Sequence, residues 1–366
     1  MKKTGVYIWC CGVLLLTFIT QSCSGEDLIA EDRKKNLFNS QTDLTKKSKN
    51  FYSKTEPDTY SLTDRFKDES LLTLPCESTD FGDVLSGYFE SLLTDPAFDF
   101  DLLNYYLELN RKYVTFYHGE NYYGENGEFN KLAEKRIREL TKFWDLNREI
   151  RLNGQHNSFL NDREILTDMI ESFDRTVRNR TEAYAKADLL LELNKDSPNF
   201  PENPYFAFDA FTKSNGLLVI GDGLLEGIMD TGIDGDLAFT AVLAHEWWHQ
   251  AQFEHEDTWD YTDQLSNPTE ISRFSELEAD FAAAYYLAHK RGATYNWKRI
   301  EEYFRLSFNV GDCLIQSMDH HGTPTQRLSA AELGYELAAS AQKKGFILSP
   351  SEVHFAFLEV FEDITK

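Results

Sequence analysis

Positive charge is scarce in this sequence. Its 366 residues include 37 lysines and arginines against 61 aspartates and glutamates, which gives a formal net charge of −24. A surface with so much negative charge repels the phosphates of nucleic acids and the headgroups of anionic lipids. The composition therefore argues against a nucleic-acid partner and favours an acidic, soluble protein that works outside the cytoplasm.

Long apolar runs are also missing. The stretch from Val6 to Ile19 is uncharged and mostly apolar, but it is too short to span a bilayer comfortably. It follows two lysines and is soon followed by Ser22-Cys23, which resembles the lipobox of bacterial lipoproteins. We therefore expect residues 1–22 to be a signal peptide and Cys23 to carry a lipid, with a plain signal peptide as the alternative. The resemblance implies a bacterial outer-membrane lipoprotein, periplasmic or surface-exposed, that meets the membrane only through this anchor.

Cysteine is rare as well, with five in the chain. Cys10 and Cys11 fall in the predicted signal peptide and Cys23 is the predicted lipidation site, so Cys76 and Cys313 remain. An exported protein can join two such thiols in a disulfide. Two unlinked buried thiols agree with the sequence nearly as well.

Apolar periodicity is absent from residue 24 to about residue 70, where Lys, Asp, Glu, Ser, Thr and Asn dominate. Such a segment cannot bury enough surface to offset its ordering entropy, so we expect residues 23–70 to form a flexible tether. Helical spacing follows over residues 71–198, which we predict to be a mostly helical region. The expected elements there are helices over Asp80–Leu93, Gly127–Leu146 and Asn161–Asn194 (one helix or two), and a short strand over Lys112–Tyr117.

A proline-rich break at Asn199–Pro204 opens the last region, residues 199–366. The expected elements are strands over Tyr205–Phe211 and Leu217–Ile220, then helices over Glu270–Lys290, Trp297–Met318, Pro324–Lys343 and Ser351–Phe361. The predicted fold class is α+β and mostly helical, with a small sheet and a helical N-terminal region. The strand over Leu217–Ile220 either offers an open edge to an extended peptide or is a buried core strand.

The most informative stretch is Leu243-Ala-His-Glu-Trp-Trp-His-Gln250. His245 and His249 are four residues apart, so on a helix they lie on the same face. Two imidazoles in this arrangement can bind one zinc ion, and Glu246 can act beside it as general base. The flanking residues favour a helix, with Asp236 as a candidate N-cap. The motif is short enough to arise by chance, so its weight depends on a second half of the site.

That second half is Ser275-Glu-Leu-Glu-Ala-Asp280, in an alanine-rich helical stretch. A catalytic zinc takes three protein ligands and keeps one position for water. Glu276 is the candidate third ligand, and Asp280 can accept a hydrogen bond from the outer nitrogen of a liganding histidine. Taken alone, Glu276 is better explained by the solvated face of an ordinary helix, but next to the histidine pair the role of metal ligand is favoured. His255, in the polar loop after the motif, is not expected to bind the metal.

His-Glu-x-x-His followed by Glu-x-x-Ala-Asp resembles the gluzincin peptidases grouped with the CAAX prenyl endopeptidase and the HtpX heat-shock protease. Gly216 to Leu225 resembles the strand and Gly-Leu-Leu segment that precede the catalytic helix in that family. His321 to Arg327 resembles the family's His-Pro-x-x-x-x-Arg segment. Trp248, where the family has a small residue, and Gly322, where it has proline, are departures. The resemblance covers residues 200 to 335 and implies a zincin-type catalytic helix beside a small sheet, with residues 199–366 as a zinc metallopeptidase domain.

The sequence thus predicts a zinc-dependent endopeptidase that acts on a polypeptide substrate, with one Zn²⁺ held by His245, His249 and Glu276. Glu246 would be the general base, Asp280 would orient a ligand, and the resemblance gives His321 a role at the metal or at the developing oxyanion. A non-proteolytic, chaperone-like lipoprotein is the alternative, with Trp247 and Trp248 on its binding surface. A zinc-less structural relative is disfavoured because the full ligand set is present. The sequence does not specify an oligomeric state.

Overall fold

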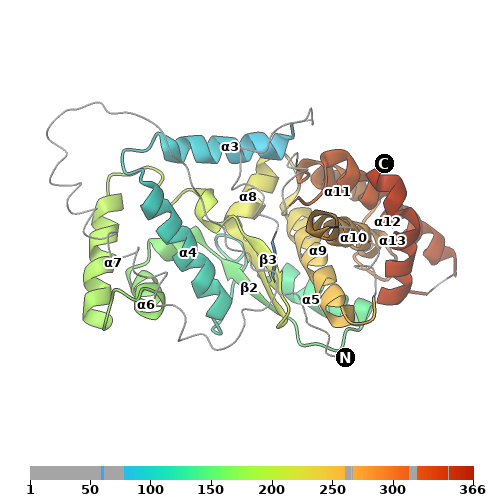
Figure 1. Cartoon of the computed structure of the whole chain (residues 1–366), viewed down its shortest axis with the longest axis horizontal. Helices are drawn as coiled ribbons and strands as arrows, with labels where there is room; N and C mark the ends of the chain where they lie inside the picture. Colours follow the sequence, from blue (N-terminus) through green and yellow to red (C-terminus); the bar gives the residue numbers. More distant parts are fainter. Residues whose placement is uncertain (1–58, 62–77, 260–264, 266, 313–319, 345) are drawn as a thin grey trace. The chain divides into compact units, whose positions relative to one another are not determined.

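The computed structural model describes residues 59–61, 78–259, 265, 267–312, 320–344 and 346–366, and within these ranges the fold is α+β and mostly helical (Figure 1). The predicted fold class is therefore confirmed. The predicted signal peptide over residues 1–22 and the cysteines Cys23, Cys76 and Cys313 lie outside the described residues. No helix in the described part combines the length and apolar character needed to cross a bilayer.

The sheet has four strands in the order β1 (Thr59–Ser61), β3 (Ala210–Lys213), β4 (Leu217–Gly221) and β2 (Arg151–Gln155). β3 pairs antiparallel with both β1 and β4, and β2 runs parallel to β4 with Arg151 opposite Leu217. Every residue of β4 is buried. The suggestion that this strand offers an open edge to a peptide is wrong, because β2 and β3 occupy both of its edges.

The sheet also changes the predicted domain organisation. β1 lies inside the segment predicted as a tether, and its three residues pair with β3 instead of staying unstructured. β2 comes from the region predicted as helical, yet it pairs with β4 across the boundary drawn at residue 199. Residues 51–366 form one compact unit, so the predicted helical and catalytic regions share a single sheet and core.

The N-terminal helices agree with the apolar spacing in most places. They are α3 (Asp80–Leu93), α4 (Phe100–Phe116), α5 (Asn130–Trp144), α6 (Arg163–Phe173) and α7 (Arg180–Asn194), with a short 3-10 turn η5 (Asn157–Leu160). The strand predicted over Lys112–Tyr117 is wrong, because α4 runs through it to Phe116. Leu103, Tyr106 and Val114 lie on one buried helical face, and this periodicity outweighs the local β-propensity of the segment.

The C-terminal helices surround the sequence motif. They are α8 (Asp222–Asp230), α9 (Gly235–His255), α10 (Pro268–Ala288), α11 (Trp297–Asn309), α12 (Pro324–Lys344) and α13 (Pro350–Thr365). Two predicted bounds are wrong: a 3-10 turn η6 (Pro204–Ala207) replaces the first half of the strand predicted from Tyr205, and α11 ends at Asn309. α9 packs against α10, β3 and β4 (Figure 1).

The central helix, α9, is buried without a break from Leu237 to Gln252. Trp248 is fully buried, with its ring 4.8 Å from that of Trp144 on α5 and 5.8 Å from that of Trp259. The bulky residue that departs from the family pattern thus fixes α9 against the N-terminal half of the fold. Polar residues on this helix, including the motif histidines, are buried with it and need partners inside the protein.

We predict that Trp248→Ala lowers the free energy of unfolding by about 3–5 kcal/mol, because the cavity left by a buried tryptophan is incompletely refilled. Urea unfolding measures this change. Trp297→Ala is the matched control, since Trp297 is 53% exposed. A loss at Trp248 no larger than at Trp297 would contradict the packing described here.

The start of α9 differs from the prediction by two residues. The N-cap is Asp234, whose side chain accepts a hydrogen bond from the backbone N–H of Leu237, and Asp236 lies in the first turn. Asp234 also pairs with Arg299 on α11.

Asp234→Ala should therefore destabilise the protein by about 1 kcal/mol, the usual effect of losing an N-cap. Asp236→Ala should lose only the few tenths of a kcal/mol of a charge near a helix N-terminus. Thermal unfolding of both variants measures the two losses of stability. A larger loss in Asp236→Ala than in Asp234→Ala would mean that the cap is misassigned.

Candidate metal centre

The packing of α9 against α10 brings together the two halves of the sequence motif. His245 and His249 lie one turn apart on α9 and face Glu276 on α10. One ligand atom from each of these residues lies within 4.8 Å of the others. The two imidazole Nε2 atoms are 3.3 Å apart, and Glu276 oxygens lie 3.2 Å from Nε2 of His245 and 3.5 Å from Nε2 of His249. This buried group can hold a metal ion.

The outer nitrogens of both histidines are engaged elsewhere. Nδ1 of His245 lies 3.0 Å from Oδ1 of Asp280, and Nδ1 of His249 lies 2.7 Å from Oε1 of Gln252. Because both partners accept, each Nδ1 carries the hydrogen, and the Nε2 of a neutral ring is left with its lone pair. Two Nε2 lone pairs and a carboxylate then point at the same small space, and only a proton or a metal cation relieves their repulsion.

The pKa values of the three candidate ligands are shifted in different directions. Burial opposes the charged form of His245, but its hydrogen bonds to Asp280 and Glu276 prevail and raise its pKa to about 9. Burial lowers the pKa of His249 to about 4. Burial also opposes the charged form of Glu276, yet His321 and His245 together hold its pKa well below the ordinary value. These shifts favour a proton on His245 over one on His249, and a metal ion bound at Nε2 of His245 would displace it.

Asp280 is held from the opposite side by Arg327 on α12, which is 1% exposed. The guanidinium donates from Nε to Oδ2 at 2.6 Å and from Nη2 to Oδ1 at 2.8 Å. Burial alone would raise the pKa of Asp280, but Arg327 and His245 lower it. Asp280 thus stays ionised in the core and fixes the ring of His245, as the helical spacing suggested.

Glu246 has no hydrogen-bond partner for either carboxylate oxygen within the described part of the chain, although it is fully buried. Its burial raises its pKa to about 8. A carboxyl group left without partners in the core is costly, and such groups cluster where proton transfer is needed. Glu246, the residue predicted as general base, is thus a buried carboxyl group with a raised pKa near His245 and Glu276.

His321 lies against the same centre. Its Nδ1 is 3.0 Å from Oε2 of Glu276, and its backbone N–H donates to Oδ2 of Asp312 at 2.9 Å. The next residue, Gly322, has a φ of +105°, which proline cannot adopt. This backbone explains the departure from the family's proline. The structure brings His321 to the carboxylate of the predicted third ligand.

Several residues of this centre were missed by sequence reasoning: Gln252, Glu278, His354 and Asp312, together with a role for Arg327. Gln252 carried a signal, since it lies one helical turn after His249. The others come from α10, α13 and the segments around α12, and their meeting depends on tertiary packing.

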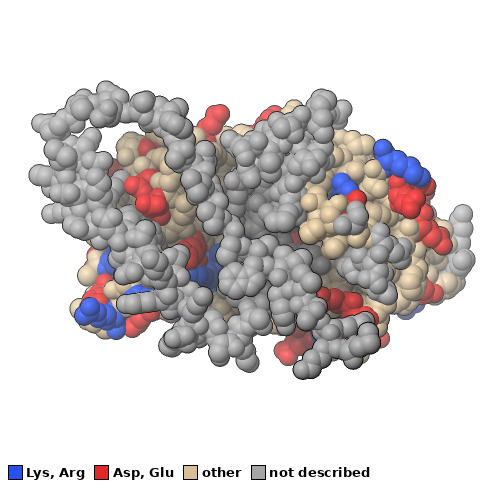
Figure 2. All heavy atoms as spheres, in the orientation of Figure 1, with Lys and Arg blue, Asp and Glu red and all other residues tan. Residues whose placement is uncertain are grey.

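Trp247 and Trp248, predicted to lie on a binding surface in the alternative function, are 2% and 0% exposed. That part of the prediction is wrong, because both rings belong to the core. On the face seen in Figure 2, the coloured acidic and basic side chains form small separate groups, with no continuous basic patch among the described residues.

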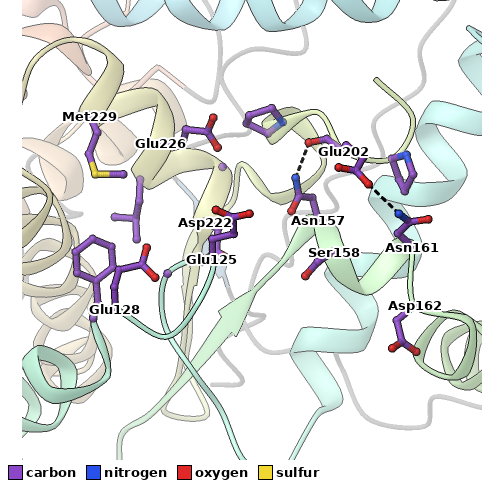
Figure 3. Close-up of a pocket in the computed structure, with 16 residues that line it drawn as sticks. Glu125, Glu128, Asn157, Ser158, Asn161, Asp162, Glu202, Asp222, Glu226 and Met229 are labelled. Atoms are coloured by element: carbon purple, nitrogen blue, oxygen red, sulfur yellow. Dashed lines mark hydrogen bonds between the residues drawn. The ribbon is translucent and has the colours of Figure 1, made fainter. Parts of the chain in front are cut away.

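A separate cavity of about 600 Å³ lies on the N-terminal side of the fold (Figure 3). Figure 3 shows Glu128, Asp222 and Glu226 on one side of it and Glu202 on the other. The lining includes six carboxylates and no lysine or arginine: Glu125, Glu128, Asp162, Glu202, Asp222 and Glu226. No residue of the metal centre lines it. An anionic ligand is disfavoured there by charge.

Comparison of the chain with protein-family models, with curated proteins and with solved structures finds no match in any of the three. What is said of this site therefore rests on its own geometry and chemistry.

Metal binding should stabilise the fold, because the three ligand side chains converge only in the folded state. At a free zinc concentration about a hundred times the dissociation constant, the gain is about 2.7 kcal/mol. We expect zinc to raise the melting temperature of the metal-stripped protein, and His249→Ala to abolish the rise. His255→Ala is the control on the same helix, since His255 lies outside the ligand group. An equal rise in both variants would place the metal elsewhere.

Proposed function

We propose that this chain is a zinc-dependent endopeptidase of the bacterial envelope or cell surface. The observation that carries the proposal is the buried, partnerless Glu246 next to the group formed by His245, His249 and Glu276. Two histidines and one carboxylate form a donor set typical of catalytic zinc, which keeps a position for water. The similarity of the motifs to gluzincin peptidases supports the same reading.

His245, His249 and Glu276 would hold the zinc ion, which would act as a Lewis acid that activates water and polarises a substrate carbonyl. Glu246 accepts the proton of the attacking water and later returns it to the leaving amine. Burial raises the pKa of Glu246 above its ordinary value, and this makes its carboxylate a stronger base. Asp280 and Gln252 hold the ligand rings, and His321 fixes Glu276 from the side.

The envelope location rests on the apolar stretch at the start of the chain and on Cys23, and the acidic composition is consistent with it. A lipid at Cys23 would tether the catalytic unit, residues 51–366, to the membrane. The alternative, a non-proteolytic binding protein, placed Trp247 and Trp248 on its binding surface, but both side chains are buried.

Glu246→Gln should reduce cleavage of an unfolded polypeptide by at least about a hundredfold, because the amide cannot accept the proton. Zinc content should stay unchanged, since Glu246 is not a ligand. Cleavage of fluorescently labelled, denatured casein measures the activity, and Glu254→Gln, on the same helix but away from the ligands, is the control. Full activity in Glu246→Gln would rule out the proposed base.

A further inference from the structure

A chain of hydrogen bonds leaves the metal centre through His249 and ends on the C-terminal helix. Nδ1 of His249 meets Oε1 of Gln252 at 2.7 Å, and Nε2 of Gln252 donates to Oε2 of Glu278 at 2.7 Å. The other oxygen of Glu278 lies 2.6 Å from Nδ1 of His354 on α13. We call Gln252, Glu278 and His354 the α13 relay.

The direction of this relay follows from its partners. The amide nitrogen of Gln252 faces the backbone oxygen of Ser275 at 3.0 Å as well as the carboxylate of Glu278, and an amide donates to both. The amide oxygen must therefore face His249. Nδ1 of His249 then carries the hydrogen, and Nε2 presents its lone pair to the ligand group.

All three members of the relay are buried, with exposures of 3% for Gln252, 0% for Glu278 and 1% for His354. Water therefore cannot replace a lost partner without reaching the core. The far end is also fixed, because the ring of His354 stacks on Trp259 with centroids 4.3 Å apart. The indole of Trp259 donates to Ser351 at the start of α13.

We propose that Gln252 is a positioning residue for the metal ligand His249, and that the α13 relay makes metal affinity depend on how α13 is docked. The inference rests on the metal centre that the proposed function requires, but it does not need proteolysis. By holding Nδ1–H of His249, Gln252 selects the tautomer and ring orientation that present Nε2 to the metal. Glu278 and His354 in turn hold the amide of Gln252.

The test compares two buried glutamines of α9. Gln252→Leu removes the acceptor for His249, whereas Gln250→Leu removes contacts to Thr212 and Lys213 of β3 and to Arg148, all away from the metal centre. Zinc affinity of the full chain is measured by competition with a chromophoric chelator. Gln252→Leu should bind zinc about 10–100-fold more weakly, the usual effect of losing a partner of a liganding histidine. Gln250→Leu should keep the wild-type affinity.

A spectroscopic readout separates positioning from general destabilisation. The visible spectrum of the Co²⁺-loaded protein reports ligand geometry, so it should change in Gln252→Leu and not in Gln250→Leu. His354→Phe provides a second variant if Gln252→Leu does not fold. It keeps an aromatic ring against Trp259 but removes the donor to Glu278, and it should bind zinc more weakly than the wild type.

The inference would be overturned if Gln252→Leu bound zinc with wild-type affinity and gave an unchanged cobalt spectrum. If Gln252→Leu is unfolded, wild-type zinc affinity in His354→Phe would overturn it. Absence of zinc binding in the wild type would overturn it as well. If the wild type binds zinc but cleaves no polypeptide, only the proposed function is contradicted. A weaker zinc affinity in Gln252→Leu would then still support the α13 relay.

Discussion

The structure depends on one electrostatic constraint where α9 meets α10. Two imidazole nitrogens and one carboxylate, from His245, His249 and Glu276, converge in a space closed to bulk water. Their outer atoms are committed to other partners, so the inner lone pairs cannot turn away from each other. A proton on His245, whose pKa is raised by Asp280 and Glu276, would ease the repulsion. A divalent cation satisfies all three groups at once, and this is the physical reason to regard the group as a metal centre.

The surrounding fold follows from the need to hold these polar groups in a core. Asp280 and Arg327 balance each other beside His245, and Gln252 and Glu278 continue the polar contacts behind His249. Buried polar groups stay stable only when such networks are complete, which ties α9, α10, α12 and α13 together. Packing of Trp248 against α5 joins the other side of α9 to the N-terminal half. Among the described residues, Glu246 makes no hydrogen bond to this network through its carboxylate.

Local signals predicted a large part of this fold and of the site. The predicted helix over Asp80–Leu93 agrees with the structure because its apolar spacing is regular. The spacing of the residues on α9 and α10 predicted the ligand group only when the two motifs were taken together. The strand over Arg151–Gln155 was missed because its sequence lacks β-branched and aromatic residues, and it forms by pairing with β4. A role for His354 was also missed, because this residue is far from the motif in sequence and approaches the site only through tertiary packing. Asp236 was predicted as the cap of α9 because aspartate is a good capping residue, but Asp234 has the same side chain, and only the backbone geometry shows that Asp234 is the cap.

X-ray absorption at the zinc edge of the purified, zinc-loaded protein tests the central claim most directly, because it reports the identity and distance of the ligands. We predict one zinc per chain with two imidazole nitrogens at about 2.0–2.1 Å and carboxylate or water oxygens at about 2.0–2.2 Å. The multiple-scattering signal of two histidine rings should disappear when both His245 and His249 are replaced. A zinc shell containing sulfur at about 2.3 Å, or a protein that retains no zinc, would contradict the account.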